Sequence, residues 1–465
     1  MSTPAGLLSP VWAGTEAAAL VSEEALLSCL LEVEATWGEV LAEARAAPRE
    51  SAEAIRAIAA DPAAAGFTVQ DIAAAAVGGG NPVIPMLAQL RSALADRRAS
   101  DAALHRGATS QDVLDTSLVL SLHRAGRAIL RDAGATGDAL AELARTHRDT
   151  VCVARSLTQH ALPTSFGLRA AGWLDGLSRA TARFQTALQG LPLQWGGAVG
   201  TQAALSDSLG APQAAELTDQ LSSRLQLPKT TRPWHTQRQP LLEAASALAG
   251  LTAAMGKAAG DVLTLQRQEI AEVREPSAAG RGGSSAMPQK QNPVLSTLIR
   301  SAALAAPQHL AALHQAAAAA TDERPDGAWH AEWAPLAELL RLTGGAVARG
   351  GELFAGLIVD PDAMGRNLGV TGGALLSERV LARLSGSFPG GRPELQQVIR
   401  RSATEGASLK TLLRDELPTE TFTDVELDAL LDPSDYLGRT GEFIDAALTD
   451  YAALTNYAAQ RRRWT

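Results

Sequence analysis

Hydrophobic positions recur at helical spacing along most of this chain. The longest such row covers residues 236–274, and further apolar positions beside it widen the apolar face. The row consists of Leu241, Ala245, Leu248, Thr252, Met255, Ala259, Val262 and Gln266. A single helix over this range would be about 60 Å long, much longer than a typical globular helix. Because such a helix cannot bury its apolar face alone, the pattern predicts a helical bundle that is shared between subunits.

Similar patterns predict other long helices over residues 116–148, 164–188, 294–320 and 335–357. No run of alternating β-branched residues indicates a strand, so the predicted fold class is all-α. Residues 277–285 are small, polar and rich in glycine, and we expect them to form a mobile loop.

The same pattern divides the chain into three parts. We expect an N-terminal helical domain over residues 1–105, a central long-helix bundle over residues 106–355 and a C-terminal helical domain over residues 356–465. The fold is then a central bundle flanked by two smaller helical domains.

Composition narrows the class of protein. The chain is 46% hydrophobic and 20% charged, which is ordinary for a globular protein. Its net charge of −9 argues against a nucleic-acid partner. Only Cys29 and Cys152 occur, so no disulfide framework is expected. The first ten residues lack the features of a signal peptide, and no apolar stretch reaches the ~18 residues that cross a bilayer. We therefore expect a soluble cytoplasmic protein without a membrane partner.

Several motifs for metals and cofactors are absent. The chain has no GxxxxGK[ST] phosphate loop, no HExxH and no CxxC. His330 and Glu332 have the spacing that begins a zinc deaminase motif, but the cysteine half of that motif is missing. We therefore expect no metal and no cofactor.

The segment with the most chemical content is GGSSAMPQKQNP, residues 282–293. It places Ser284 on a flexible loop, and Lys290 and Asn292 just before a predicted helix. A lysine ammonium and the backbone N–H groups of a helix start both stabilise developing negative charge. The alternative is an ordinary Gly/Ser linker.

Two further segments have both a structural and a functional interpretation. In HRGATSQDVLDT, residues 105–116, Thr109 and Ser110 are good helix N-caps. In RSLTQHALPTSFG, residues 155–167, Pro163 suits the first turn of a helix and His160 can be a core residue. Either segment can instead carry site residues.

Taken together, the three segments resemble the fumarase/aspartase superfamily. Residues 283–293 match its signature GSSxMPxKxNP at every fixed position. The second segment resembles H-x-G-x-T-S-x-D-x-x-D-T, and the third resembles R-T-H-x-x-x-A-x-P, with Leu157 in place of the histidine. Leucine cannot transfer a proton, so the usual histidine acid is absent.

With leucine at position 157, this segment resembles that of the bacterial 3-carboxy-cis,cis-muconate cycloisomerases. Four other stretches agree with the same enzymes: GLLSPVWAG (6–14), GNPVIP (80–85), QWGGAVGT (194–201) and ERPDGAWHAEW (323–333). The resemblance covers the chain up to about residue 360. It implies a homotetramer whose active sites are each assembled from three subunits, and no cofactor.

The resemblance also implies a reaction. A carboxylate of the muconate adds across a C=C bond, and the carbon beside another carboxylate takes a proton through an aci-carboxylate intermediate. The product is carboxymuconolactone, within protocatechuate breakdown (the β-ketoadipate pathway of aromatic hydrocarbon catabolism). The cycloisomerases usually read MPHKRNP, whereas this chain has Gln289 and Gln291. The alternative is therefore a sister lyase that eliminates an amine or nitrite from a substituted succinate. A third possibility is a catalytically silent helical scaffold.

Candidate site residues follow from the three segments and their chemistry. Ser284 is the expected general acid/base, with Lys290 beside it and His160 as the nominee for the partner acid/base. The expected substrate-binding residues are His105, Thr109, Ser110, Gln111, Arg155, Gln159, Asn292 and Arg324. Because the substrate is a polyanion, an acidic protein must concentrate positive charge at this site. Arg324 is the expected bidentate carboxylate clamp.

Overall fold

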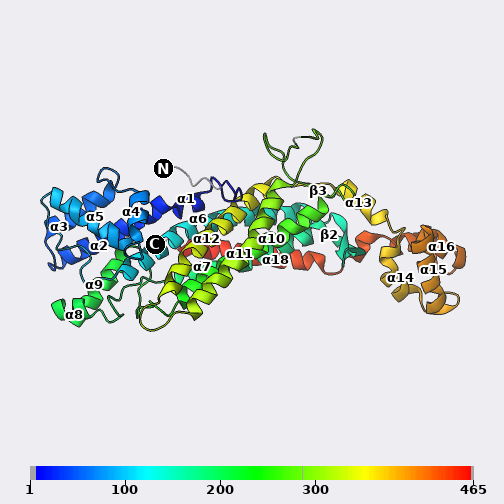
Figure 1. Ribbon diagram of the computed structural model, residues 1–465. Coiled ribbons are helices and arrows are strands. Elements are labelled where there is room, and N and C mark those ends of the chain that lie inside the picture. Colours follow the sequence, from blue (N-terminus) through cyan, green and yellow to red (C-terminus); the bar gives the residue numbers. More distant parts are fainter. Residues whose placement is uncertain (1–6, 285, 462–465) are drawn as a thin grey trace. The chain divides into compact units, whose positions relative to one another are not determined.

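The computed structural model describes residues 7–284 and 286–461. Helices make up most of it, and the predicted all-α class is confirmed (Figure 1). Two expectations fall partly outside the described residues. These are the absence of a signal peptide, which involves residues 1–6, and the second serine of the loop, Ser285.

The chain separates into two compact units. The first comprises the chain up to Ala133, together with Ala180–Gly256 and Leu298–Arg349. The second comprises Gly134–Arg179, Lys257–Thr297 and the chain from Gly350 onward. The three-domain division stays a prediction.

Short helices of the first unit pack near the N-terminus, drawn in blue in Figure 1. They are α1 (Glu16–Leu20), α2 (Glu23–Glu43), α3 (Arg49–Ala60), α4 (Val69–Ala76) and α5 (Val83–Asp96). Ser22 and Thr68 cap α2 and α4 by accepting a backbone N–H in the first turn. Most of α2 is buried, so this helix forms the centre of the cluster. Two more short helices, α8 (Ala203–Leu209) and α9 (Ala211–Arg224), belong to the same unit.

The predicted long helices are present. They are α6 (Ser110–Thr146), α7 (Phe166–Gln189), α10 (Gln239–Leu265), α11 (Val294–Ala318) and α12 (Gly327–Ala355). The predicted start of α12, at Pro335, was eight residues too late, because the helix begins at Gly327 and Pro335 lies inside it.

The helix predicted over residues 236–274 was too long. α10 ends at Leu265, where the chain turns back and the Glu272 amide donates to the Leu265 carbonyl (2.9 Å). Ala271 takes a left-handed φ of 55° in this turn. A short strand, β3 (Val273–Arg274), follows and pairs with β4 (Ile358–Val359). No proline or glycine marks the turn, so the periodic pattern continued past the true end of the helix.

The second unit also contains a hairpin that the sequence did not predict. β1 (Val151–Ser156) and β2 (Gln159–Ser165) pair antiparallel, and Pro163 lies within β2, three residues before α7. The interpretation of Pro163 as a first-turn residue was therefore wrong.

The C-terminal helices of this unit have a core of their own. They are α13 (Pro361–Gly369), η1 (Ala374–Leu376), α14 (Ser377–Leu384), α15 (Gly391–Glu405), α16 (Leu409–Glu416), α17 (Asp424–Leu430), η2 (Pro433–Tyr436) and α18 (Thr440–Arg461). Buried leucines, among them Leu395, Leu413 and Leu427, fill the core between α14 and α17. None of the helices within the described ranges has both the length and the apolar character needed to span a membrane.

The pKa values of two histidines predict how the free energy of unfolding varies with pH. Burial lowers the pKa of His123 on α6 and of His147 after it. The folded chain therefore binds fewer protons than the unfolded chain just below the ordinary imidazole pKa of about 6.5. The free energy of unfolding should be undiminished above about pH 6.5 and decrease as the pH falls through that value. Urea denaturation between about pH 7 and 5.5 measures this, and a His123→Gln variant should show a shallower decrease. Higher stability at the acidic end would contradict it.

Candidate active site

The first turn of α6 holds the residues expected to contact substrate in the first unit. Thr109 precedes the helix, and its amide donates to the Asp112 carboxylate (3.1 Å), so Asp112 provides half of a capping box. The Thr109 hydroxyl accepts from Arg324 Nη2 (2.9 Å). Both Thr109 and Ser110 are half-buried. The structure therefore brings Arg324 to the start of α6, as the candidate site requires.

Asp112 fixes this helix start to a distant loop. It is fully buried, and its carboxylate accepts from the amides of Gly196 and Gly197, both at 2.8 Å. It also lies 2.8 Å from Nε2 of the buried His235. A Cβ at Gly196 would lie 2.7 Å from Pro233, so this close approach requires glycine. These contacts explain why the QWGG stretch accompanies the α6 segment.

One turn further along α6, Asp115 belongs to a buried ionic cluster. Arg238 lies between Asp115 (2.7 Å) and Glu332 (2.7 Å), and its side chain is only 1% exposed. Trp329 Nε1 donates to the same Asp115 carboxylate (2.9 Å). Burial alone would lower the pKa of Arg238, but the two carboxylates outweigh it and raise that pKa. The guanidinium is therefore charged, and it joins the starts of α6, α10 and α12.

The Gln111 side chain is held by contacts within the protein. It is fully buried, and its amide nitrogen donates to the His235 carbonyl (2.8 Å) and to Asp115 (3.2 Å). Its role as a substrate contact stays a prediction, and its buried Oε1 has no hydrogen-bond partner among the described residues. Arg324 remains the stronger candidate, and it also donates to the Ala198 carbonyl (2.6 Å).

His105 already has a carboxylate partner. Its Nδ1 lies 2.6 Å from Glu34 of α2, and its side chain is 16% exposed. Glu34 itself is fully buried.

In the second unit, the hairpin carries the segment with the substituted histidine. Leu157 and Thr158 form its two-residue turn, with φ values of 50° and 68°. Left-handed φ at both positions is typical of a type I′ turn, which normally uses Asn or Gly. Leu157 is 93% exposed at the tip, and Gln159 beside it is also exposed. The hairpin therefore presents an apolar tip where a family histidine would stand.

Arg155 on this hairpin is paired with a buried carboxylate. It makes two contacts with the buried Glu272 carboxylate, at 2.7 and 3.1 Å. Asn367 Nδ2 also donates to Glu272 (2.7 Å), and Arg169 lies 3.7 Å from it. Arg155 therefore anchors the hairpin.

His160 lies on β2 and is half-buried. Burial lowers its pKa, the Arg155 guanidinium lowers it further, and Glu272 opposes both. Its buried Nδ1 has no hydrogen-bond partner among the described residues. The lowered pKa favours the neutral form of the ring.

The loop with the signature motif is closed at its base. The Asn292 amide donates to the Gly282 carbonyl (2.8 Å), where Gly282 has a left-handed φ of 71°. Ser284 is half-buried, and its Oγ accepts from the Met287 amide (3.1 Å). Lys290 is exposed.

The expected use of the α11 amides is not what the structure shows. The Glu275 carboxylate already accepts from the amides of Leu295 (3.0 Å) and Ser296 (2.7 Å). These amides already donate within the protein, so Lys290 is the main positively charged group that the loop offers to a substrate.

The candidate cations thus fall into two classes. Arg155 and His105 are paired with buried carboxylates. Arg324 contacts neutral oxygens only, and neither it nor Lys290 forms an ion pair within the described part of the chain. These two side chains are therefore best suited to hold an anion.

Several residues of this framework were not found from the sequence. Asp112 and Asp115 lie within a quoted segment, but Glu34, Arg238 and Glu272 do not. The available signal was an acidic or basic residue on a helix face that is otherwise apolar, as with Glu34 among the buried residues of α2. That signal indicates a buried charge but does not identify its partner.

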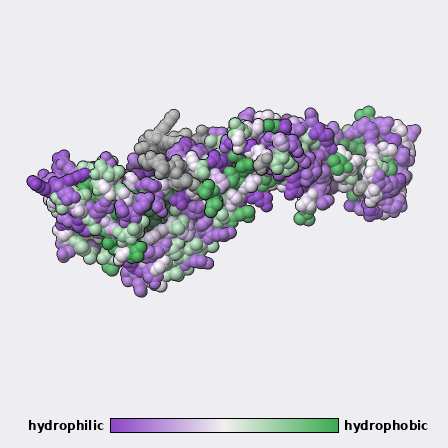
Figure 2. Space-filling view, turned by 45° about the horizontal axis from the view of Figure 1, so that its top comes forward, coloured by the Kyte–Doolittle hydropathy of each residue, from purple (hydrophilic) through white to green (hydrophobic). Residues whose placement is uncertain are grey.

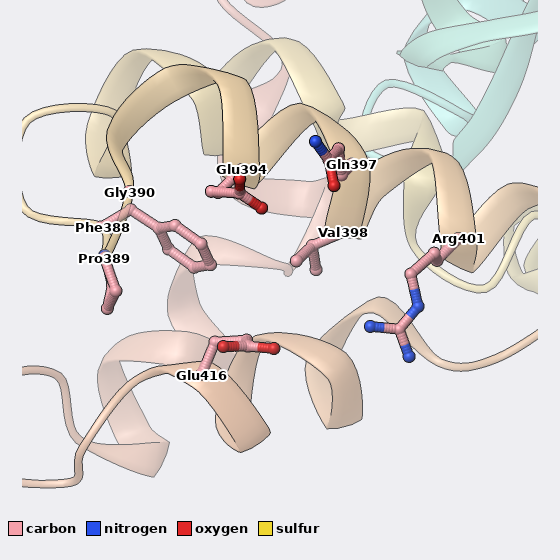
Figure 3. Close-up of a pocket in the computed structure, with 8 residues that line it drawn as sticks. All are labelled: Phe388, Pro389, Gly390, Glu394, Gln397, Val398, Arg401 and Glu416. Carbon is pink, nitrogen blue, oxygen red and sulfur yellow. The ribbon is translucent and has the colours of Figure 1, made fainter.

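A surface pocket of about 320 Å³ lies between α15 and α16, and none of the candidate residues is among those that line it. It is lined by Phe388, Pro389, Gly390, Glu394, Gln397, Val398, Arg401 and Glu416. Figure 3 shows Glu394 and Glu416 on opposite sides of the hollow. Two carboxylates and one arginine do not suit a polyanion. Among the described residues, no cluster of His, Cys, Asp and Glu could hold a metal ion.

Comparison with known proteins gives a consistent result. A family model described as lyase matches residues 16–307. The chain is 43% identical to a nitrosuccinate lyase of Streptomyces davaonensis, covering 95% of this chain and 94% of that protein. It is 37% identical to a 3-carboxy-cis,cis-muconate cycloisomerase of Bradyrhizobium diazoefficiens, covering 95% and 97%. The solved 3-carboxy-cis,cis-muconate lactonizing enzyme of Pseudomonas putida is similar in structure, with a TM-score of 0.87 and 33% identity over 97% and 99% of the two chains.

Proposed function

Because the chain belongs to the lyase family, within the fumarase/aspartase superfamily, we propose that it transfers a proton at the carbon beside a substrate carboxylate. A bond from the neighbouring carbon to oxygen or nitrogen forms or breaks in the same reaction. The observation that carries this proposal is the loop that holds Ser284, Lys290 and Asn292, in which Lys290 forms no ion pair with any of the described residues. The positive charge of Lys290 and the proposed proton carrier, Ser284, are thus on one segment.

The first proposed substrate is 3-carboxy-cis,cis-muconate. In its lactonisation, a carboxylate oxygen bonds to one carbon of a C=C bond, and the adjoining carbon takes a proton. Similarity to cycloisomerases over nearly the whole chain supports this choice. Leu157 supports it as well, because the side chain at the position of the family histidine cannot transfer a proton.

A second candidate substrate is nitrosuccinate. Its elimination would break a C–N bond, remove a proton beside a carboxylate and yield fumarate and nitrite. The 43% identity to a nitrosuccinate lyase favours it, as do Gln289 and Gln291 beside Lys290. Neutral glutamines would suit a substrate with fewer negative charges than a tricarboxylate.

One assay separates the candidates. Purified protein is incubated with carboxymuconate, and loss of the diene absorbance is followed in the ultraviolet. A parallel reaction with nitrosuccinate is followed by fumarate absorbance and by colorimetric nitrite. Lactone formation supports the first substrate, nitrite release supports the second, and activity on neither indicates the scaffold hypothesis.

The roles of the site residues are part of the proposal. Ser284 transfers the proton, Lys290 stabilises the aci-carboxylate, and His160 accepts a proton as a neutral ring. Arg324, Thr109, Ser110, Gln159, Asn292 and His105 bind substrate. Arg155 and Gln111 hold the site in place through Glu272, Asp115 and His235.

The two classes of arginine predict different variant behaviour. Arg324→Gln should raise KM about 10- to 100-fold, because a hydrogen bond to a charged group contributes ~1.5–3 kcal/mol. Its partners in the protein are neutral, so Tm should change little. Arg155→Gln should instead lower Tm, because Glu272 would stay buried without its main partner. Steady-state kinetics and thermal melts of both variants test this. An unchanged KM in Arg324→Gln would remove Arg324 from the site.

We also propose a homotetramer in the cytoplasm, in which subunits complete each other's sites. The middle of an exposed stripe of α10 is formed by small residues, Ser246, Gly250 and Ala253, which permit close helix packing. Leu304 on α11 is 66% exposed. Hydrophobic residues also lie among hydrophilic ones on the face shown in Figure 2. Light scattering at micromolar concentration should report four chains, and Ser246→Arg with Ala253→Arg should dissociate them. A stable wild-type monomer would contradict the proposal.

A further inference from the structure

Glu34 is a carboxylate buried in an apolar part of the fold, where an ionised group needs compensating contacts. It lies in the middle of α2, on a face formed by Leu30, Leu31 and Trp37, and it is fully buried. An ionised carboxylate in such a position is strongly destabilising unless it is paired and hydrogen-bonded. Its hydrogen-bond partners in the described chain both belong to His105.

The contact fixes His105 at two atoms. One oxygen of Glu34 accepts from the His105 amide (3.0 Å), and the other lies 2.6 Å from the ring Nδ1. His105 has a left-handed φ of 55°, which strains a residue with a Cβ. Because the carboxylate contacts both backbone and ring, it stabilises this backbone conformation and one orientation of the imidazole together.

The loop is held to α2 at a further point. Trp37 Nε1 donates to the Arg106 carbonyl (2.8 Å), while the Arg106 guanidinium is directed away, to the Ala46 carbonyl. Glu34 is thus the charged side chain in contact with the His105 ring. From His105, three residues of loop (106–108) lead to Thr109, which contacts Arg324.

We infer that Glu34 is a positioning residue of the proposed active site, holding the His105 ring with Nδ1 turned inward and Nε2 left to meet substrate. An ionised carboxylate accepts hydrogen bonds only, so Nδ1 carries a proton. Nε2 is then the ring atom free to exchange a hydrogen bond with a substrate carboxylate or water. The inference rests on the proposed function, in which His105 binds substrate.

The direct test of the orienting role does not need activity. Protein labelled with ¹⁵N-histidine should show His105 with Nδ1 protonated, and Glu34→Gln should shift it toward a mixture of tautomers, because an amide can donate as well as accept. His105→Asn identifies the signal. If wild-type His105 carries its proton on Nε2 alone, the inference is wrong.

The functional test uses two variants and a control. His105→Asn should keep the fold, because asparagine tolerates left-handed φ and its amide can donate to Glu34. Lacking Nε2, it should lower kcat/KM about 10- to 100-fold with little change in Tm, and Glu34→Gln should approach the same loss. Glu32→Gln is the control, since Glu32 lies on the same helix but pairs with Arg124.

The outcomes separate the two proposals. If Glu34→Gln lowers Tm but leaves kcat/KM unchanged, the pair is structural and the inference is wrong. Wild-type kcat/KM in His105→Asn would reject it equally. If wild-type protein turns over neither carboxymuconate nor nitrosuccinate, the proposed function fails, while the ¹⁵N spectrum still decides whether Glu34 orients the ring.

Discussion

Ser284→Ala is expected to lower kcat by about 10²- to 10⁴-fold, the usual contribution of a general acid–base group. The Ser284 hydroxyl lies on the loop that also carries Lys290, and its hydrogen bonds to described residues come from the backbone amides of Ala286 and Met287. Removing it therefore deletes the proton carrier without disturbing Arg324 or the start of α6. KM should change much less than kcat, because the carboxylate contacts remain. Steady-state kinetics with whichever substrate the assay supports measures both constants.

The neighbouring serine offers the control. Ser285 lies outside the described residues, so its substitution tests the sequence assignment alone. Ser285→Ala should cost much less than Ser284→Ala if the first serine is the acid/base. A Ser284→Ala enzyme that keeps more than about a tenth of wild-type kcat would reject that role. His160 would then be the next residue to test, because its lowered pKa favours the neutral form of the ring.

Arg238→Met is expected to destabilise the folded chain by about 3–5 kcal/mol. Arg238 is almost fully buried between Asp115 and Glu332. Methionine fills much of the same space but leaves two carboxylates buried close together without a cation. The loss should appear as a lower urea midpoint, and as a fall in the amount of soluble protein.

Two matched variants show where that cost arises. Arg49→Met removes an exposed ion pair with Glu53 on α3, and it should change stability by less than about 1 kcal/mol. Adding Asp115→Asn and Glu332→Gln to Arg238→Met should restore part of the loss, because the uncompensated charges disappear. If the triple variant is no more stable than Arg238→Met, lost packing rather than buried charge explains the effect.

The long helices could be predicted because each buries a wide apolar face that repeats at helical spacing. The end of α10 could not, because a turn at Ala271 without glycine or proline leaves the hydrophobic period unbroken. The β1–β2 hairpin was missed for a related reason. Its turn uses Leu157 and Thr158 in place of the usual Asn or Gly, so no turn signal was present.

The candidate site was predictable only as far as motifs reach. Thr109 and Arg324 were nominated from separate segments, and the structure brings them into contact. The pairing of Arg155 with Glu272 and of His105 with Glu34 joins residues 117 and 71 positions apart. Residue type alone made each of these cations look available to substrate. Among the described residues, Arg324 and Lys290 are the nominated cations without a carboxylate partner, and spacing along the chain contains no information about that pairing.

The carboxylate of Glu275 has a consequence for how this enzyme can diversify. The Glu275 carboxylate accepts hydrogen bonds from the amides of Leu295 and Ser296, and these bonds connect the two ends of a segment about twenty residues long. The ends are therefore fixed whatever residues occupy the tip, and a new tip carries little additional loop-closure entropy. Gln289 and Gln291 lie in that tip, between the two connected ends. We therefore expect that residues 286–291 can be exchanged for those of a relative while the contacts of Glu275 keep the two ends of the segment in place.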